Sequence, residues 1–278
     1  MSKINDYLDE DVGFGDITSD ILLGEEVGSA RVKAQEDCVL AGMEEAIEVF
    51  RELGLNTFPM TRDGERVSRG EDILVVEGSL KKILIGERLA LNFLMRMSGI
   101  ATTTSNVVRE CKRLNPAIRI AATRKTTPGF RFFEKKAVIL GGGDPHRYRL
   151  DDAILIKDNH LRVVGSVTQA ITKAKNASFS KKIEVEVETM EQAVEAAKAG
   201  ADIIMLDNMK AEQVEVAYLA VKKLNDHALV EVSGGMSPET APKFARHADI
   251  LSLGWITHSS RAVQFNLEVT AVRLGEPS

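Results

Sequence analysis

Several short apolar runs of this sequence end abruptly in residues that can carry charge or hydrogen-bond a ligand. The clearest is ILIKDNH, in which residues 154–156 are followed at once by Lys157, Asp158, Asn159 and His160. A buried strand that ends for reasons of shape alone usually ends in turn-forming residues such as Gly or Pro. The pattern therefore indicates that the end of this strand faces a binding site.

This arrangement is found at six apolar runs after residue 101, the run before Lys157 included. In sheets of parallel strands, ligands bind beyond the carboxyl ends of the strands. We therefore expect the residues that follow these runs to share one rim. In chain order they are Thr123, Arg124 and Lys125; Lys157; Glu186; Asp207; Ser233, Gly234 and Gly235; and Gly254.

Positive charge is concentrated in one part of this rim. Residues 119–149 contain eight Lys or Arg and two acids, a net charge of +6 in a chain whose total is −5. Such a concentration predicts an anionic ligand, held by Arg124, Lys125 and Arg147. We interpret three other basic residues of the segment as structural charges on a helix face or a sheet edge: Arg119, Lys135 and Lys136.

The segment GGGDPHRYR, residues 141–149, joins a helix to the next strand through three glycines and a proline. Glycines alone are a weak signal, because a helix C-cap followed by a turn would explain them. An imidazole and a guanidinium side by side, from His146 and Arg147, are suited to bind a carboxylate. A lone histidine is more often structural than catalytic, so the prediction for His146 depends on its neighbour Arg147.

Two acids at adjacent strand ends, Glu186 and Asp207, predict a site for a divalent cation such as Mg²⁺. The alternation in EVEVE places Glu184, Glu186 and Glu188 on one face, so pairing with Lys or Arg remains an alternative for each of them. Beyond these acids, Ser233, the two glycines that follow it and Gly254 offer a hydroxyl and backbone N–H groups to a phosphate.

Strand-like and helix-like segments alternate from residue 101 onwards, which predicts βαβ units and a parallel sheet that either closes into a barrel or stays open. The first 100 residues mix short strands, turns and helices and are typical of an α+β domain. We therefore expect an α+β domain over residues 1–100 and a parallel α/β domain over residues 101–259.

Composition excludes some other classes of protein. The pI of about 5.7 gives no general basic field for nucleic acid. The acidic N-terminus and the charges within the best apolar stretch argue against export and membrane spanning. The two cysteines, Cys38 and Cys111, have no CxxC partner or neighbouring His cluster, so we expect free thiols in a reducing, cytoplasmic environment.

The motifs together resemble those of the quinolinate phosphoribosyltransferase family, also called carboxylating nicotinate-nucleotide pyrophosphorylase. The resemblance covers most of the chain in the family order. It is carried by EDVGFGDITS, ERLALNFLMRMSGIAT, TRKTTPGFR, KKAVILGGGDPHRYRLDDAILIKDNHL, EVEVE, LDNM, VSGG and LGWITHS. The conjunction of TRKT with PG, GGG with HR, and IKDNH is far more specific than any one of these motifs.

The resemblance implies transfer of ribose 5-phosphate from phosphoribosyl pyrophosphate to quinolinate, with loss of pyrophosphate and CO2, to give nicotinate mononucleotide for NAD synthesis. It implies an N-terminal α+β sandwich domain over residues 1–100, completed by 260–278, and an open, TIM-like α/β barrel of about seven strands over 101–259. It also implies a homodimer with shared active sites, with a higher assembly such as a hexamer left open. Arg124, His146, Arg147 and Lys157 would hold the two quinolinate carboxylates, and Arg88 would reach in from the neighbouring subunit.

The same resemblance assigns the phosphorylated substrate. Lys125, Glu186 and Asp207 would handle the pyrophosphate and its Mg²⁺, and Ser233, Gly235 and Gly254 would hold the 5-phosphate.

Three alternatives remain at this point. A Schiff-base aldolase would use Lys157 as a nucleophile. A molybdenum-transport paralogue would share the fold but depart from the basic motifs, which are intact here. A non-catalytic binding protein would use only the basic rim, and Glu186 and Asp207 would weaken its hold on an anion in the absence of a metal.

Overall fold

The protein, described here by a computed structural model over residues 3–274, divides into two compact units. Unit 1 comprises Met1–Thr102 and Arg261–Ser278, and unit 2 comprises Thr103–Ser260. Helix α4, Leu80–Leu114, is 35 residues long and contributes residues to both units. No helix within the described residues is both long enough and apolar enough to span a membrane.

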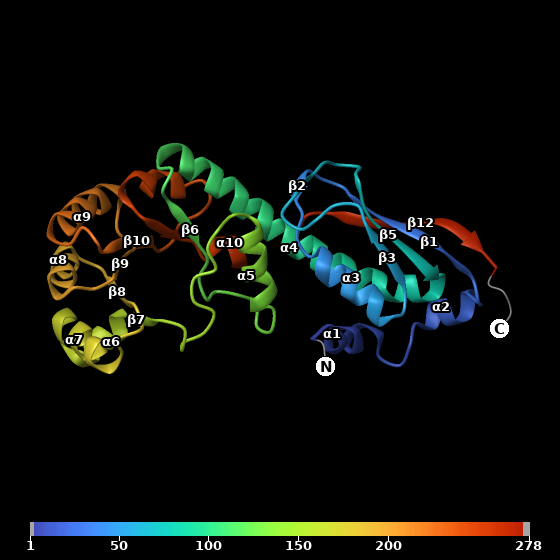
Figure 1. The fold of residues 1–278 in the computed structure, drawn as a ribbon, viewed down its shortest axis with the longest axis horizontal. Coiled ribbons are helices and arrows are strands. Elements are labelled where there is room, and N and C mark those ends of the chain that lie inside the picture. The colour runs from blue at the N-terminus through green and yellow to red at the C-terminus, as the bar shows by residue number, and fades with distance from the viewer. Residues whose placement is uncertain (1–2, 275–278) are drawn as a thin grey trace. The chain divides into compact units, whose positions relative to one another are not determined.

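Unit 1 is built on a four-stranded antiparallel sheet in the order β12-β1-β5-β3. Its strands are β1 (Val27–Ala34), β3 (Asn56–Pro59), β5 (Asp72–Ser79) and β12 (Phe265–Arg273), with a separate short pair, β2 (Cys38–Val39) and β4 (Arg66–Val67). Its shorter helices are α1 (Lys3–Val12), α2 (Ile17–Leu22) and α3 (Met43–Glu52). Figure 1 shows α3 and the first part of α4 running beside the sheet, in blue to teal.

Helix α4 has an apolar stripe along one side. Its four members recur at spacings of four, four and three residues, which places them on one side of a helix. All are buried, with 8% or less of their surface exposed: Leu89, Phe93, Met97 and Ile100.

Unit 2 has the alternating α/β pattern that the sequence predicts. Six parallel strands lie in the order β6-β11-β10-β9-β8-β7. They are β6 (Arg119–Ala121), β7 (Ile154–Ile156), β8 (Ile183–Val187), β9 (Ile203–Asp207), β10 (Leu229–Ser233) and β11 (Ile250–Ser252). The helical segments are α5 (Arg131–Leu140), α6 (Asp158–Val164), α7 (Val167–Ala177), α8 (Met190–Ala199), α9 (Ala211–Leu224), the 3₁₀ helix η1 (Ala241–His247) and α10 (Trp255–His258).

The helices between these strands begin and end where local chemistry favours it. Thr189 caps α8 by accepting a hydrogen bond from the backbone N–H of Gln192, and Ser166 does the same for α7. Gly200 ends α8 in the left-handed conformation, at φ 74°. Figure 1 shows α7, α8 and α9 as a layer outside the strands, in yellow to orange.

The sheet brings the strand ends to one level. Ser233, the last residue of β10, pairs with Asp207 at the end of β9 and with Ser252 at the end of β11. Ser252 in turn pairs with Ala121, the last residue of β6. Residues that follow these strands therefore emerge at the same edge of the sheet, as the sequence predicts.

The sheet has six strands rather than about seven. At the position of a further strand, Asp144 forms one isolated parallel bridge with Ala121, through Ala122 N–H to Asp144 O (2.9 Å) and Asp144 N–H to Ile120 O (2.7 Å). The next residue, Pro145, has no N–H with which to continue a ladder. The strand therefore stops after one residue, and β6 and β7 remain the two edges of an open sheet.

Candidate active site

A cavity of about 480 Å³ lies at the carboxyl ends of the unit 2 strands. Charged and polar side chains from loops far apart in the sequence converge on it. The predicted site residues that line it are Thr123, Arg124, Lys125, His146, Arg147, Lys157, Glu186, Asp207, Ser233, Gly234 and Gly235. Gly254 lies directly behind this lining, because a Cβ on it would come within 2.9 Å of the Lys125 side chain.

Of the four polar residues that end the ILIKDNH stretch, Lys157 alone lines the cavity. His160 is part of a helix cap, since its Nδ1 accepts the backbone N–H of Lys157 at 2.8 Å at the start of α6. Asp158 forms an ion pair with Arg162 one turn further along the same helix, at 3.5 Å. The polar run therefore serves two purposes, a site residue and the start of a helix.

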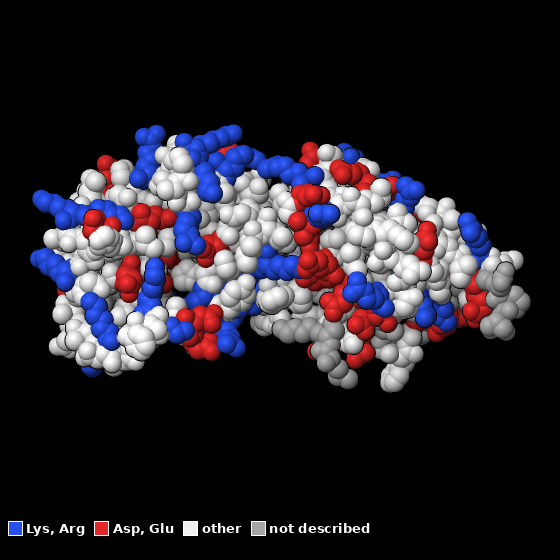
Figure 2. Space-filling view, viewed as in Figure 1, with Lys and Arg blue, Asp and Glu red and all other residues white. Residues whose placement is uncertain are grey.

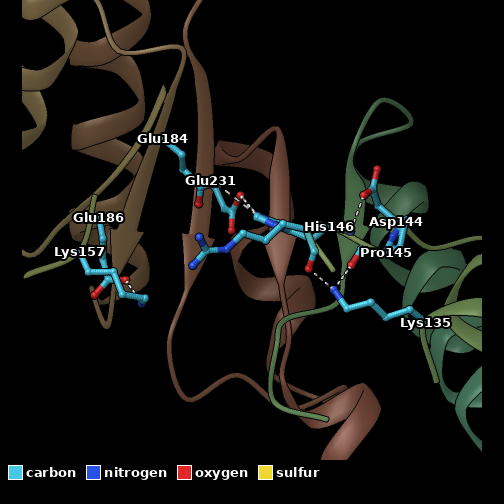
Figure 3. A network of polar contacts seen from close by, with 9 residues as sticks. Lys135, Asp144, Pro145, His146, Lys157, Glu184, Glu186 and Glu231 are labelled. Atoms are coloured by element: carbon cyan, nitrogen blue, oxygen red, sulfur yellow. Dashed lines mark hydrogen bonds and ion pairs between the residues drawn. The ribbon is translucent and has the colours of Figure 1, made fainter. Parts of the chain in front are cut away.

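Lys157 and Glu186 form an ion pair across the cavity wall, with Nζ and Oε2 2.7 Å apart (Figure 3). The Glu186 side chain is nearly buried and that of Lys157 is half exposed. Asp207 is close enough to this pair for its pKa to be raised, first by its own burial and then by the negative charge of Glu186. The Asn208 side chain donates a hydrogen bond to Asp207 at 2.6 Å.

The structure distinguishes the three glutamates of EVEVE. Glu186 lies in the cavity wall, whereas Glu188 is exposed and lines other surface grooves. Glu184 is buried, with 2% of its surface exposed, and faces His146. Their alternation alone could not separate these roles.

His146 points between two buried carboxylates from neighbouring parts of the sheet (Figure 3). Its Nε2 lies 3.4 Å from Glu184 Oε2 and 3.5 Å from Glu231 Oε2. Glu231 is fully buried, and no hydrogen bond reaches either of its carboxylate oxygens within the described part of the chain. The imidazole is therefore the nearest group that can offset the charge of these acids.

The surroundings of His146 raise its pKa to about 10. Burial acts to lower it, but the close approach and negative charges of Glu184 and Glu231 outweigh burial. The Arg147 backbone N–H lies 2.7 Å from His146 Nδ1 and orients the ring so that Nε2 faces the acids. Burial likewise raises the pKa of Glu184, only partly offset by His146.

The basic side of the cavity holds like charges close together. The pKa of Arg147 is lowered, first by burial and then by the positive charge of Arg124. The Arg124 Nε is buried and is without a hydrogen-bond partner among residues 3–274. Two guanidinium groups held side by side with an unused donor form a site that an anion would stabilise.

The loop that carries Arg124 and Lys125 is fixed by α5 and α10. Glu134 accepts hydrogen bonds from the backbone N–H and the hydroxyl of Thr127, at 3.1 and 3.0 Å. The Thr257 hydroxyl donates to the backbone oxygen of Lys125 at 2.7 Å. These contacts hold the loop while leaving the Lys125 side chain exposed at the cavity.

The structure corrects one of our structural interpretations and confirms another. Lys135 does not solvate a helix face, because it is fully buried and donates to backbone oxygens of the 145–147 segment. Sequence spacing within α5 could not reveal this, since both acceptors lie ten or more residues away along the chain. Arg119 lies on an edge strand and pairs with Asp144, as expected for a structural charge.

The turn after β10 is shaped by two glycines. Gly234 and Gly235 have φ values of 99° and 57°, which residues with side chains rarely adopt. A Cβ on Gly234 would lie 2.7 Å from the backbone nitrogen of Asn208, so the turn approaches the end of β9 closely. The backbone N–H groups of such a turn can bind a phosphate.

Sequence reasoning assigned no role to three polar residues of the lining. Glu231 and Ser252 lie on β10 and β11, and Asn208 follows β9 at φ 55°. The Ser252 hydroxyl is buried and has no hydrogen-bond partner among the described residues. The available signal for Glu231 was a single acid within the otherwise apolar strand LVEV, which a pattern of strand ends does not capture.

Arg88 is the predicted site residue that the cavity does not include. It is exposed on the unit 1 part of α4 and lines a different cavity of about 300 Å³. That cavity also contains Asp11, Asp16 and Ile17, all from unit 1.

Comparison with known proteins agrees with this geometry. Family models for quinolinate phosphoribosyl transferase match residues 16–98, as the N-terminal domain, and residues 100–268, as the C-terminal domain. A curated protein of Methanothermobacter thermautotrophicus, "Probable nicotinate-nucleotide pyrophosphorylase (carboxylating)", is 43% identical over 98% of this chain and 100% of its own length.

The nicotinate-nucleotide pyrophosphorylase (carboxylating) of Rattus norvegicus is 35% identical over 96% of this chain and 90% of its own. The solved structure of the nicotinate-nucleotide pyrophosphorylase from Francisella tularensis superposes with a TM-score of 0.91 at 34% identity, covering 96% of this chain and 95% of that one. With both domains matched in order and the charged cavity at the expected strand ends, the chain belongs to the quinolinate phosphoribosyltransferase family.

Proposed function

We propose that the unit 2 cavity is where this chain, a quinolinate phosphoribosyltransferase, joins quinolinate to phosphoribosyl pyrophosphate. The reaction gives nicotinate mononucleotide, pyrophosphate and CO2. The observation that supports this location most directly is the division of charge in the cavity. One side holds two guanidinium groups with an unused donor. The other holds the carboxylates of Glu186 and Asp207, and the pKa of Asp207 is raised by its burial and by the charge of Glu186.

Quinolinate would bind on the basic side. Arg124 and Arg147 can each grip a carboxylate through two parallel N–H donors, and His146 is held beside them. Lys157 would add a fourth cationic group once an anion competes with Glu186 for its ammonium. Four donors are more than one carboxylate needs, which supports a substrate with two.

Phosphoribosyl pyrophosphate would bind along the ends of β9, β10 and β11. The Ser233 hydroxyl and the N–H groups of the turn at Gly234 and Gly235 suit the 5-phosphate, with Gly254 allowing Lys125 to approach. The exposed Lys125 ammonium would then lie beside the pyrophosphate. This arrangement would bring C1 of the ribose toward the ring nitrogen of quinolinate.

The family implies Mg²⁺, and the carboxylates of Glu186 and Asp207 fit that ion. Both offer oxygen, the ligand atom that Mg²⁺ prefers, from adjacent strands. The raised pKa of Asp207 indicates negative charge that a cation would stabilise. Bound there, Mg²⁺ would neutralise charge on the departing pyrophosphate.

The protein's own groups act on both steps by electrostatics. Lys125 would stabilise pyrophosphate as it leaves an oxocarbenium-like ribose, and the arginines would orient the ring nitrogen for attack. Attack makes the ring cationic, so the electrons of the adjacent C–CO2 bond can stay on that ring carbon as CO2 departs. The carbon then takes a proton from water, which gives nicotinate mononucleotide. Lys157 acts as a fixed charge here. A Schiff-base role would need its neutral amine, whereas it is ion-paired with Glu186.

The chain itself can test this function. Purified protein incubated with quinolinate, phosphoribosyl pyrophosphate and Mg²⁺ should release CO2 and nicotinate mononucleotide in equal amounts, because each turnover yields one molecule of each. Omission of Mg²⁺ should stop product formation. A folded protein that binds quinolinate but yields neither product would instead support a binding role for the basic rim.

We also propose a homodimer whose active sites are shared, with Arg88 supplied by the neighbouring subunit. Four large apolar side chains near the Arg88 cavity are 72% or more exposed: Phe14, Ile17, Ile21 and Leu22. Such a group on one short segment is typical of an interaction surface. A cytoplasmic location is proposed on the basis of the two free thiols, Cys38 and Cys111.

Complementation tests the shared site. Arg88→Ala and Lys125→Ala proteins should each be nearly inactive, yet mixed dimers should regain activity because one of their two sites would contain both wild-type residues. Differently tagged subunits would establish that mixed dimers have formed. Mixed dimers without any activity would show that Arg88 does not act across the interface.

A further inference from the structure

Helix α5 contains a lysine whose side chain is fully buried, Lys135. A buried ammonium is costly unless its hydrogen-bonding capacity is used. Lys135 Nζ donates to the backbone oxygen of Arg147 at 2.5 Å and also to that of Pro145 (Figure 3). It also lies over the Tyr148 ring, 5.2 Å from its centre.

The two acceptors lie on either side of His146. This residue has φ 52°, a backbone conformation that residues other than glycine seldom adopt. Asp144 contributes a further contact, since its Oδ1 accepts the His146 backbone N–H at 2.8 Å. An unusual conformation persists only where its surroundings determine it, and here Lys135 links the residues before and after the strained position.

The held segment carries two of the groups that line the basic side of the cavity, His146 and Arg147. The glycines that precede it, at 141–143, provide little stiffness of their own. The sheet does not hold the segment either, because the ladder stops at the single bridge of Asp144. Lys135 therefore supplies, from behind, the fixation that a continued strand would have given.

We propose that Lys135 is a positioning residue, which holds segment 145–147 so that His146 and Arg147 face a carboxylate of the substrate. This inference rests on the proposed function, because the carboxylate is taken to be that of quinolinate. Lys135 is buried behind the segment and does not line the cavity, so it acts through the segment alone.

The charge of Lys135 gives this role a pH dependence. Its pKa is lowered to about 8, first by burial and then by the positive charges of Arg131 and Arg124. The negative charges of Asp152 and Asp144 act to raise the pKa of Lys135, and the Tyr148 ring faces its ammonium group. Below about pH 8 its hydrogen bonds to the segment are charge-assisted, and above that pH they become the weaker bonds of a neutral amine.

This pH effect can be told apart from loss of folding. The pKa of Lys135 in the folded state is below that of an unfolded lysine, so between about pH 8 and 10.5 the unfolded chain binds the extra proton. The contribution of Lys135 to the free energy of unfolding therefore increases as pH rises through this window. Affinity for quinolinate should fall over the same window.

The test compares Lys135→Met, which keeps the length and apolar stem but removes the donor, with Lys173→Met, at an exposed lysine of α7, as a control. Quinolinate affinity is measured by calorimetry, and the two KM values by turnover. Lys135→Met should weaken quinolinate binding on the order of 10-fold or more, as expected when a group that orients a binding residue is lost. The KM for phosphoribosyl pyrophosphate should stay within about 2-fold, and Lys173→Met should match wild type.

The wild-type pH profile provides a second measurement that does not depend on how the variant folds. Quinolinate affinity of wild type should fall across pH 8, below the pKa of about 10 of His146, while the affinity of Lys135→Met should change less. A folded Lys135→Met protein with wild-type affinity, or a wild-type affinity that is constant from pH 7 to 9, would overturn the inference. Lack of turnover by wild type would instead count against the proposed function.

Discussion

Gly234→Ala is the substitution whose cost can be worked out most directly from the structure. At φ 99° an alanine is strained even if there is space for its methyl group, because the left-handed conformation costs a residue other than glycine about 1–2 kcal/mol. Its Cβ would also lie 2.7 Å from the Asn208 backbone nitrogen and 2.3 Å from its Oδ1. A packed region that must move to admit a methyl group typically costs a further 1–3 kcal/mol or so.

The neighbouring glycine provides a matched control. Gly235 also has a positive φ, 57°, but a Cβ there would come no closer than 4.0 Å to Asn208. Gly235→Ala should therefore show the conformational cost alone, and the two variants should differ by about 1–3 kcal/mol. This difference can appear in the free energy of unfolding. If Asn208 moves to make room, it appears instead in the free energy of substrate binding.

The expected effect on substrate binding follows from the hydrogen bonds that Asn208 makes. Its backbone N–H donates to Ser233 O at 3.0 Å, and its side chain donates to Asp207 at 2.6 Å. If the whole difference appears there, phosphoribosyl pyrophosphate would bind about 5- to 150-fold more weakly to Gly234→Ala than to Gly235→Ala. Calorimetry of that substrate and denaturant unfolding would measure both. Equal stability and equal affinity of the two variants would refute the steric reasoning.

Three other predictions follow from the cavity and its surroundings. Quinolinate should be used on the order of 100-fold better than nicotinate in turnover assays, because the cationic groups of the second carboxylate would be left unpaired, and similar rates would contradict that assignment. Lys157→Met should weaken quinolinate binding by about 10- to 100-fold in calorimetry, the loss of one charge-assisted hydrogen bond, while Lys198→Met on exposed α8 should not. An unchanged affinity would mean that Lys157 serves only Glu186. Burial raises the pKa of the Cys38 thiol to about 12 and that of Cys111 to about 11, so a thiol reagent at pH 7.5 should label neither until the protein is denatured, and rapid native labelling would show that these sites open.

The sequence predicts the second unit well because two signals agree there. Periodicity locates strands and helices, and polar residues at the strand ends then fall at one edge of the sheet, as the register of Ser233 with Asp207 confirms. The same reasoning fails for groups whose role depends on distant partners. Glu184 and Glu186 are equivalent by alternation, and only the positions of His146 and Lys157 separate them.

Lys135 illustrates a second limit of prediction from the sequence. Adjacent lysines on an amphipathic helix favour a solvent-exposed face, because burial of an ammonium requires acceptors that no local pattern reveals. Those acceptors are backbone oxygens, which have no signature in the side-chain sequence. The seventh strand implied by the family resemblance is reduced to the single bridge of Asp144, because the proline that follows has no N–H to continue the ladder.

The sheet of unit 1 has a consequence for how the chain is made. Its central strand β1 pairs with β12, so that Val27 is matched with Arg273, and β12 is made only after the whole of unit 2. Unit 2 lies wholly between these partners in the sequence. We therefore expect the second unit to fold before the sheet of the first unit can be completed. Nascent chains that end at residue 260 and are held on the ribosome by a flexible linker longer than the exit tunnel can be exposed to protease. They should protect residues 103–260 but not the unit 1 sheet, and protection of that sheet at this stage would exclude this order.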